Sequence, residues 1–201
     1  MNRRAFALAA LFAAFAAPAL AGVIPLAELS RYLNALSTAE AEFTQVNADG
    51  TITTGRLYIQ RPGRVRFEYA PPENNLVLAG GGQVAIFDAK SNQPPEQYPL
   101  RKTPLSLILD ANINLGRARM VVGHSGDDKS TTVTAQDPDH PEYGTIQLIF
   151  TGQPTELRQW VITDEAGSET TVILGDLKKG GTLSPRLFSI TAEAEKRGKR
   201  R

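Results

Sequence analysis

Apolar and polar residues alternate along most of the chain between residues 39 and 89, and this two-residue period predicts β-strands. The clearest case is the stretch 55–69, where two alternating runs flank Arg61-Pro62-Gly63 and predict a tight hairpin. Successive side chains of a strand point to opposite faces. One face of this hairpin therefore collects the apolar residues Leu57, Ile59, Val65, Phe67 and Tyr69.

The same face also carries a cation, because Arg61 follows Leu57 and Ile59 in the strand period. Burying a guanidinium without partners is costly, so an arginine at such a position usually has a specific role. Two interpretations remain open on this segment alone. Arg61 either reaches water from the end of its strand or forms specific hydrogen bonds inside the fold.

Two segments depart from the two-residue period and predict helices. After Pro25, leucines recur at three- and four-residue spacing, which is typical of an amphipathic helix; they are Leu26, Leu29, Leu33 and Leu36. The second segment, 103–109, begins with Thr-Pro, the residues favoured at a helix N-cap and first helical position. It is almost wholly apolar, so we expect it to cover an apolar surface.

The remaining segments predict further strands separated by Gly-, Asp- and Pro-rich turns. They are 40–46, 75–79, 83–89, 117–124, 130–136, 144–151, 155–164, 168–176 and 186–191, with 91–99 as loop or ragged edge. Some ten or eleven antiparallel strands with two or three helices predict a curved sheet or partial barrel with a helical cover.

The N-terminus predicts export. Asn2-Arg3-Arg4 is basic, residues 5–20 are uncharged, and Ala19-Leu20-Ala21 fits cleavage before Gly22. Residues 1–21 therefore read as a cleaved signal peptide, and their apolar run is shorter than the ~20 residues needed to span a bilayer. The chain after cleavage is predicted to be a soluble exported protein.

Composition limits the function further. Residues 22–195, predicted to form a single domain, contain 15 basic and 21 acidic residues, a net charge of −6 that argues against nucleic-acid binding. Residues 196–201 carry five positive charges and predict a disordered, solvated tail, with attraction to an anionic membrane or partner as the alternative. Because the chain has no cysteine, disulfides, thiol nucleophiles and thiolate metal sites are excluded.

Candidate catalytic residues are few. The two histidines, His124 and His140, lie in turn-like surroundings and predict neither a zinc site nor a triad. Gly123-His124-Ser125 begins like a nucleophile elbow, but Asp127 stands where that motif requires glycine, and strand patterns flank both sides. We predict that the protein is not an enzyme and needs no metal or cofactor.

The order of these motifs resembles the LolA family, the periplasmic carriers that take lipoproteins to the outer membrane of Gram-negative bacteria. The resemblance runs through the amphipathic first helix, Phe43-Thr44-Gln45, the 55–69 hairpin with its Arg-Pro turn, the segment 76–88 and Thr103-Pro104-Leu105. It implies an unclosed antiparallel β-barrel of about 11 strands, with a lid of helices over a hydrophobic cavity.

The resemblance also implies residue roles. The cavity that binds the lipid would be lined by Leu57, Ile59, Val65, Phe67, Tyr69 and Trp160. The lid would be formed by Leu29, Leu33, Leu36, Leu105, Ile108 and Leu109. Arg61 matches the family arginine that enters the cavity and hydrogen-bonds lid backbone, which favours a specific role for this cation.

The implied function is that of a monomeric chaperone for acylated lipoproteins. It would accept them from an inner-membrane ABC transporter of the LolCDE type and pass them to an outer-membrane receptor of the LolB type. The alternative is another periplasmic half-barrel that binds lipid or glycolipid or senses lipoproteins, as RseB does. The chain lacks the second domain of RseB, and a hydrolase lacks a nucleophile–base pair here.

Overall fold

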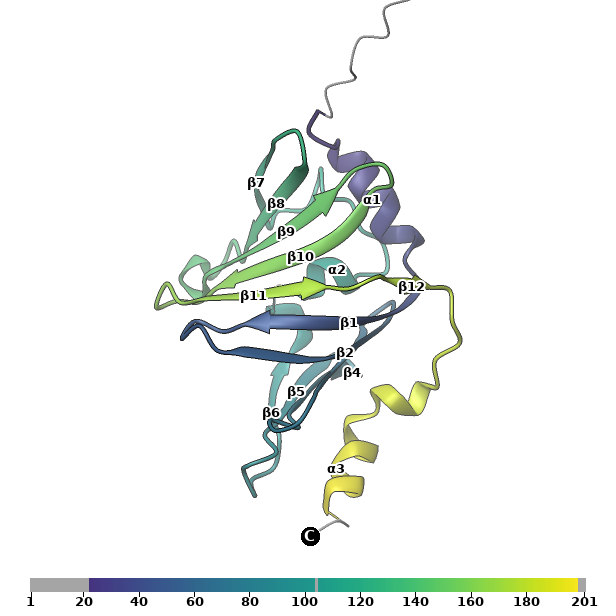
Figure 1. Cartoon of the computed structure of the whole chain (residues 1–201), viewed down its shortest axis with the longest axis vertical. Helices are drawn as coiled ribbons and strands as arrows, with labels where there is room; N and C mark the ends of the chain where they lie inside the picture. Colours follow the sequence, from purple (N-terminus) through teal and green to yellow (C-terminus); the bar gives the residue numbers. More distant parts are fainter. Residues whose placement is uncertain (1–21, 104, 199–201) are drawn as a thin grey trace, which may run out of the picture.

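The computed structural model describes residues 22–103 and 105–198, which form a curved antiparallel sheet with helices on both of its faces (Figure 1). The strands are β1 (Thr38–Val46), β2 (Ile52–Gln60), β3 (Arg64–Tyr69), β4 (Leu76–Gly80), β5 (Gln83–Phe87), β6 (Glu96–Pro99), β7 (Val121–Gly126), β8 (Ser130–Gln136), β9 (Thr145–Thr151), β10 (Glu156–Thr163), β11 (Glu169–Leu174) and β12 (Lys178–Lys179). The α-helices are α1 (Leu26–Ala35), α2 (Ser106–Leu109) and α3 (Ile190–Gly198), and the 3-10 helices are η1 (Leu100–Lys102), η2 (Pro141–Tyr143) and η3 (Pro185–Phe188).

The sheet has two edges and does not close. Its order is β6-β5-β4-β3-β2-β1-β11-β10-β9-β8-β7, with β12 paired to β1. Each half is a meander of sequential strands, and the β1–β11 pairing joins the halves, with Phe43 opposite Leu174. Residues 100–120 connect edge strand β6 to edge strand β7, so this segment crosses the open side of the sheet.

The predicted hairpins are confirmed. In the first, Leu57 lies opposite Phe67 and Ile59 opposite Val65. The glycine-rich turn between β4 and β5 places Gly81 and Gly82 at φ of 58° and 77°, a left-handed conformation that glycine adopts without steric cost. The segment 91–99, expected as a loop or ragged edge, ends in the short edge strand β6.

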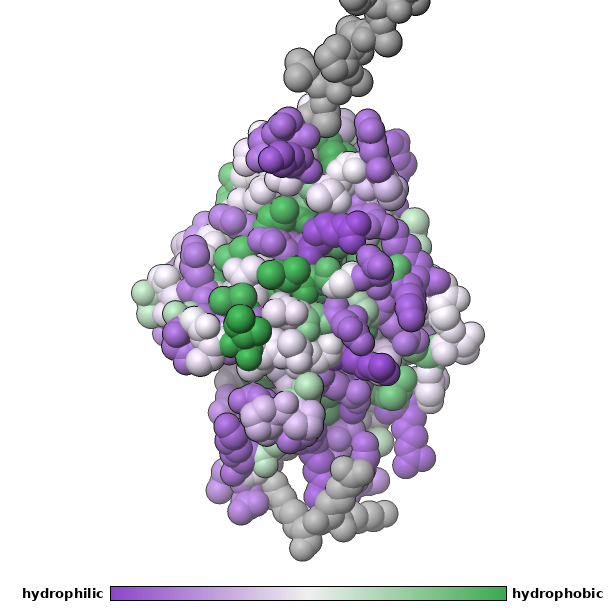
Figure 2. All heavy atoms as spheres, viewed as in Figure 1, coloured by the Kyte–Doolittle hydropathy of each residue, from purple (hydrophilic) through white to green (hydrophobic). Residues whose placement is uncertain are grey.

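The main apolar core lies between the concave face of the sheet and the segments α1, η1 and α2. A second core lies on the opposite, convex face, where Leu76, Leu78 and Phe87 pack against Leu183 and Phe188. Figure 2 looks at the face of the sheet opposite α2, where apolar patches alternate with polar ones. Among the described helices, none has the length and apolar character required to cross a membrane.

The predicted strand at 186–191 is wrong. Pro185 occupies the start of η3, and Ser184 Oγ accepts a hydrogen bond from Arg186 N, so the chain turns helically before α3. The apolar residues that suggested a strand instead pack on the convex face, where Phe188 is buried.

The predicted disordered tail is also wrong for its first three residues, because Lys196, Arg197 and Gly198 lie in α3. Arg197 Nε donates to Glu193 at 3.0 Å, and its guanidinium lies 5.2 Å from the centre of the Phe87 ring. These contacts hold the end of the helix on the convex face. Residues 199–201 and the predicted signal peptide, 1–21, lie outside the described residues.

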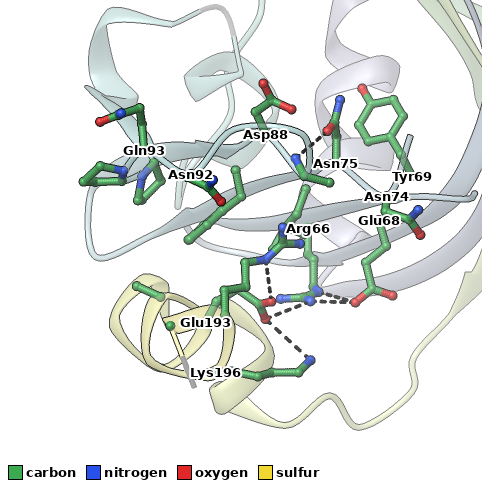
Figure 3. A pocket seen from close by; sticks show the side chains of 18 residues that line it. Arg66, Glu68, Tyr69, Asn74, Asn75, Asp88, Asn92, Gln93, Glu193 and Lys196 are labelled. Atoms are coloured by element: carbon green, nitrogen blue, oxygen red, sulfur yellow. Dashed lines mark hydrogen bonds and ion pairs between the residues drawn. The ribbon is translucent and has the colours of Figure 1, made fainter. Parts of the chain in front are cut away.

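An ion-pair network fixes α3 to β3 (Figure 3). The Arg66 guanidinium, 5% exposed, contacts Glu193 at 3.1 Å and Glu68 at 2.6 Å and donates to Leu187 O. Burial raises the pKa of Glu193, but hydrogen bonds from Arg197 and Arg66 and their positive charges outweigh burial and hold that pKa below its ordinary value. The carboxylate therefore stays charged when α3 is docked.

We expect Glu193→Ala to lower the free energy of unfolding by about 1.5–3 kcal/mol, since it removes charged hydrogen bonds from Arg66 and Arg197. The stabilisation is complete above the unfolded pKa and is lost as the pH falls through the lower folded pKa. Urea unfolding at neutral and acidic pH measures both effects. Glu195→Ala, at an exposed position of the same helix, is the control; an equal loss in that variant would contradict the assignment.

Candidate functional site

Apolar side chains of β2 and β3 line the concave face, as their alternation requires. The structure places Leu57, Ile59, Val65 and Phe67 there, each no more than 6% exposed. Trp160 joins them from β10 and is 1% exposed, so the predicted interior residues come from both halves of the sheet.

Aromatic rings meet edge to face across this surface. Phe67 lies 5.9 Å from Trp160 and 5.6 Å from Phe43, and Phe43 lies 5.2 Å from the partly buried Tyr69. Such pairs add about 0.5–1.5 kcal/mol to the stabilisation from burial. The sequence analysis did not include Phe43 among the site residues. Its period with Ala39 and Ala41, which are also buried, is the signal that would have found it.

Gly55 makes room for Phe43. A Cβ atom at residue 55 would lie 2.7 Å from the Phe43 ring and 2.2 Å from Glu68 O, so any side chain there would clash. The glycine lies directly opposite Phe43 in the β1–β2 pairing. The interior therefore needs this one position of the Gly55–Tyr69 segment to lack a side chain.

Lid residues fill the interior. Leu29, Leu33 and Leu36 from α1 and its end are buried in the same core as the β2–β3 residues. Ile108 and Leu109 from α2 are also buried there, with Leu105 partly buried against them. The interior described here is thus occupied by the protein's own side chains, which is the closed arrangement of the lid.

Residue 103 does not begin the lid helix as predicted. Thr103 Oγ1 donates to Leu100 O at 2.8 Å, which closes the preceding 3-10 turn instead of capping a following helix. The α-helix runs only from Ser106 to Leu109, and Pro104 lies outside the described residues. Beyond it, Ile113 and Leu115 are buried in the same core, although the sequence analysis did not assign them to the lid.

Arg61 connects the β2–β3 turn to two lid segments. Its guanidinium donates to Leu33 O at the end of α1 and to Asp110 O just after α2. It also lies 3.2 Å from Asn34 Oδ1. Backbone contacts strengthen this junction, since Gly63 N donates to Leu109 O at 2.8 Å.

The main acceptors of Arg61 are backbone carbonyls at helix ends. The family resemblance implied lid backbone as the acceptor, and the acceptors lie at the end of α2 and, in addition, at the end of α1. Carbonyls at the C-terminal end of a helix have no partner within the helix, which explains why the ends of α1 and α2 both accept hydrogen bonds from Arg61. Burial lowers the pKa of Arg61, and the negative charge of Asp110 opposes that shift.

Two side chains of α1 bind the 113–115 segment. Asn34 Nδ2 donates to Ile113 O at 2.8 Å, and its Oδ1 accepts from Ile113 N at 2.9 Å. Ser30 Oγ accepts from Leu115 N at 3.0 Å. Ser30 and Asn34 are four residues apart, which is a rise of about 6 Å along a helix. Their partners are two residues apart, which is about 6.6 Å along an extended chain, so the two spacings match. Helix α1 and this segment therefore form one unit.

Other side chains of α1 contact the β8–β10 half of the sheet and β12. Tyr32 Oη accepts from Leu157 N at 3.1 Å, and Thr155 Oγ1 donates to Glu28 at 2.6 Å. Lys179 Nζ lies 4.7 Å from the centre of the Tyr32 ring. The lid is thus fastened to one half of the sheet through α1, and Arg61 joins it to the other half.

One surface hollow, of about 680 Å³, borders this interior at Phe43, Gly55 and Tyr69. Others lie away from it. One of about 700 Å³ lies between α3 and the ends of β3 to β5, and its walls carry Asn75, Asp88 and Lys196 (Figure 3). Both histidines are in surface contacts: His124 Nε2 lies 2.9 Å from Ile24 O, and His140 pairs with Glu142. Neither arrangement assembles a nucleophile with a base.

Fold and site together define a class of protein: an unclosed antiparallel half-barrel whose apolar concave face is covered by helical segments joined through Arg61. The chain belongs to the LolA family, since the model of the outer membrane lipoprotein carrier protein LolA matches residues 34–191. This confirms the resemblance found in the sequence, and the predicted fold class is confirmed as well, with twelve strands in the sheet.

Individual relatives are similar along most of their length. An outer-membrane lipoprotein carrier protein of Methylococcus capsulatus is 26% identical over 178 residues, which is 85% of each chain. One from Chromobacterium violaceum is 26% identical over 189 residues, 90% of this chain and 89% of the relative. The crystal structure of a LolA superfamily protein from Nitrosomonas europaea aligns with a TM-score of 0.45 and 10% identity, over 83% of this chain and 98% of that one.

We expect Ser30→Ala combined with Asn34→Ala to free the 113–115 segment from α1. Each lost hydrogen bond should lower the free energy of unfolding by about 0.5–1.5 kcal/mol. Hydrogen exchange should accelerate at the amides of Ile113 and Leu115, whose acceptors are removed. Asn112→Ala, at an exposed position of the same segment, should leave these amides unchanged; acceleration there too would show that the segment is not held by α1.

Proposed function

We propose that this protein is a periplasmic carrier that shields the acyl chains of lipoproteins in the concave interior of its half-barrel. Membership of the LolA family supports this proposal, as do the names of its relatives. The single observation that carries it is an apolar interior filled by side chains of α1 and α2, the ends of which accept charged hydrogen bonds from Arg61. Such a cover can be exchanged for an apolar ligand.

The residues that would contact the acyl chains are Leu57, Ile59, Val65, Phe67, Tyr69 and Trp160. Burying an acyl chain yields about 0.8 kcal/mol per CH₂, so three full chains could exceed the practical ceiling of non-covalent affinity. When cargo enters, the leucines and isoleucine of the lid must leave the same surface. Net affinity is therefore the difference between two large burial terms, and release stays feasible.

Arg61 would set that difference. A hydrogen bond to a charged donor contributes about 1.5–3 kcal/mol, and 1.4 kcal/mol is a factor of ten in an equilibrium constant. The closed lid gains these bonds, and the loaded protein gives them up. In this proposal cargo comes from an inner-membrane ABC transporter of the LolCDE type and goes to an outer-membrane receptor of the LolB type, and the carrier uses no cofactor of its own.

Trp160 provides a direct test of where cargo binds, because it is the only tryptophan of the chain and lies inside the half-barrel. We expect an acylated peptide with brominated acyl chains to quench its fluorescence, since bromine quenches on contact. The same peptide with unbrominated chains is the control. Full binding of the brominated peptide without quenching would place cargo elsewhere on the protein.

Replacement of the latch tests the release step. Arg61→Leu removes the donor and keeps apolar bulk, so the open, loaded form should gain about tenfold or more over the closed, empty form. We expect lipoprotein uptake from inner-membrane vesicles to persist and transfer to outer membranes to fail. Arg61→Lys should restore transfer only partly, because an ammonium group cannot span several acceptors as the planar guanidinium does.

Arg186→Leu is the matched control for this experiment. Arg186 lies in η3 on the opposite face of the sheet and is exposed, and its side chain forms no ion pair among the described residues. Both steps should proceed normally in that variant. Normal transfer by Arg61→Leu, or equal loss of uptake and transfer, would contradict a latch.

A further inference from the structure

Charge is distributed unevenly between the lid and the rest of the molecule. We define the lid face as residues 26–36, 100–103 and 105–120, which cover the open side of the sheet, together with the adjoining β2–β3 turn, residues 61–64. It holds two acidic residues, Glu28 and Asp110, and seven basic residues: Arg31, Arg61, Arg64, Arg101, Lys102, Arg117 and Arg119. The rest of residues 22–198 holds 10 basic and 19 acidic residues. The lid face thus carries +5 and the remainder −9.

Contacts already described place these three segments on one side of the molecule. Arg61 bonds to Leu33 O and Asp110 O, and Ser30 bonds to Leu115 N. The apolar side chains of α1 and α2 are buried against the concave face. Exposed side chains of the same segments therefore point away from the sheet.

Most of these cations are available to a partner. Arg31, Arg101, Lys102 and Arg117 are exposed, and none forms an ion pair within the part of the chain that the structure describes. Arg119 pairs with Asp139 at 3.5 Å, but both side chains are more than 70% exposed. Arg64 is also exposed. Solvent and screening leave such a pair with little binding energy, so Arg119 stays accessible too.

The type of cation indicates the type of partner. Six of the seven basic residues of the lid face are arginine, against five of the ten elsewhere in residues 22–198. The planar guanidinium donates two parallel hydrogen bonds to a phosphate, which the ammonium of lysine cannot do. These cations are spread over three segments around the lid rather than gathered in a cleft. That spread suits an extended anionic surface better than a small anion.

We propose that the lid face binds the phosphate surface of a membrane containing anionic phospholipids. The acidic remainder of the molecule would be repelled by the same surface, so the field orients the protein with its lid toward the bilayer. This orientation would bring the opening of the interior to the membrane, a use that rests on the proposed carrier function. The binding to the membrane does not depend on that function.

The test is sedimentation of the purified protein with vesicles of phosphatidylcholine alone or with phosphatidylglycerol added. We expect about tenfold more protein on the anionic vesicles at about 50 mM salt, and loss of that difference at about 300 mM, where screening is stronger. Arg101→Glu with Arg117→Glu should abolish the difference. Lys90→Glu with Arg186→Glu changes the net charge equally at exposed positions outside the lid face and should bind within twofold of the parent protein.

Three results would overturn the proposal: equal loss in both double variants, binding that does not depend on phosphatidylglycerol, or equally strong competition by soluble polyglutamate, which would indicate an acidic protein as the partner. A second pair, Arg31→Glu with Arg119→Glu, tests the same face if the first pair melts at a lower temperature than the parent. Quenching of Trp160 by brominated acylated peptide separates this proposal from the carrier function. If quenching is retained but the protein does not bind vesicles, only the proposed membrane binding by the lid face is contradicted. If the protein binds vesicles but Trp160 is not quenched, only the proposed carrier function is contradicted.

Discussion

The structure depends on one constraint, the burial of an apolar concave face that the sheet cannot cover by itself. Strands β6 and β7 are the two edges of an antiparallel sheet that stays open. An open sheet with an apolar inner face needs a cover, and residues 100–120 and α1 supply one from within the chain. Since the cover is made of leucine and isoleucine side chains, it competes for the same surface as any apolar ligand. Arg61 links the two covering segments, because its guanidinium donates to the backbone of both.

Much of this arrangement was predictable from the sequence because it follows from local periods. The two-residue period of 55–69 sufficed to place Leu57 and Phe67 on one face, and the leucine spacing after Pro25 sufficed for the buried side of α1. The cation at Arg61 was identified for a physical reason, the cost of a buried charge. The family resemblance then indicated that backbone carbonyls of a lid would accept its hydrogen bonds.

What could not be predicted is long-range. Nothing in the local sequence marks Asn34 and Ser30 as binding residues, because their partners Ile113 and Leu115 lie 79 and 85 residues away in the chain. The C-terminal apolar residues were read as a strand because Leu187, Phe188 and Ile190 suit either element, and only the second core on the convex face decides between them. Arg66 likewise gave no sign in the sequence that its partner would be Glu193.

The pairing of β1 with β11 has a consequence for how the protein acquires its structure. The first and the last long strands meet in the middle of the sheet, so the contacts that join the two halves span most of the chain, and contacts of this kind slow folding. When the N-terminus emerges first, α1 has no Leu157 amide or Thr155 hydroxyl to bind until β10 has followed. During that interval the apolar face of β2 and β3 lacks its cover. Synthesis therefore exposes the same surface that the folded protein keeps covered, and a chaperone that binds extended apolar segments has its longest opportunity to bind at this stage.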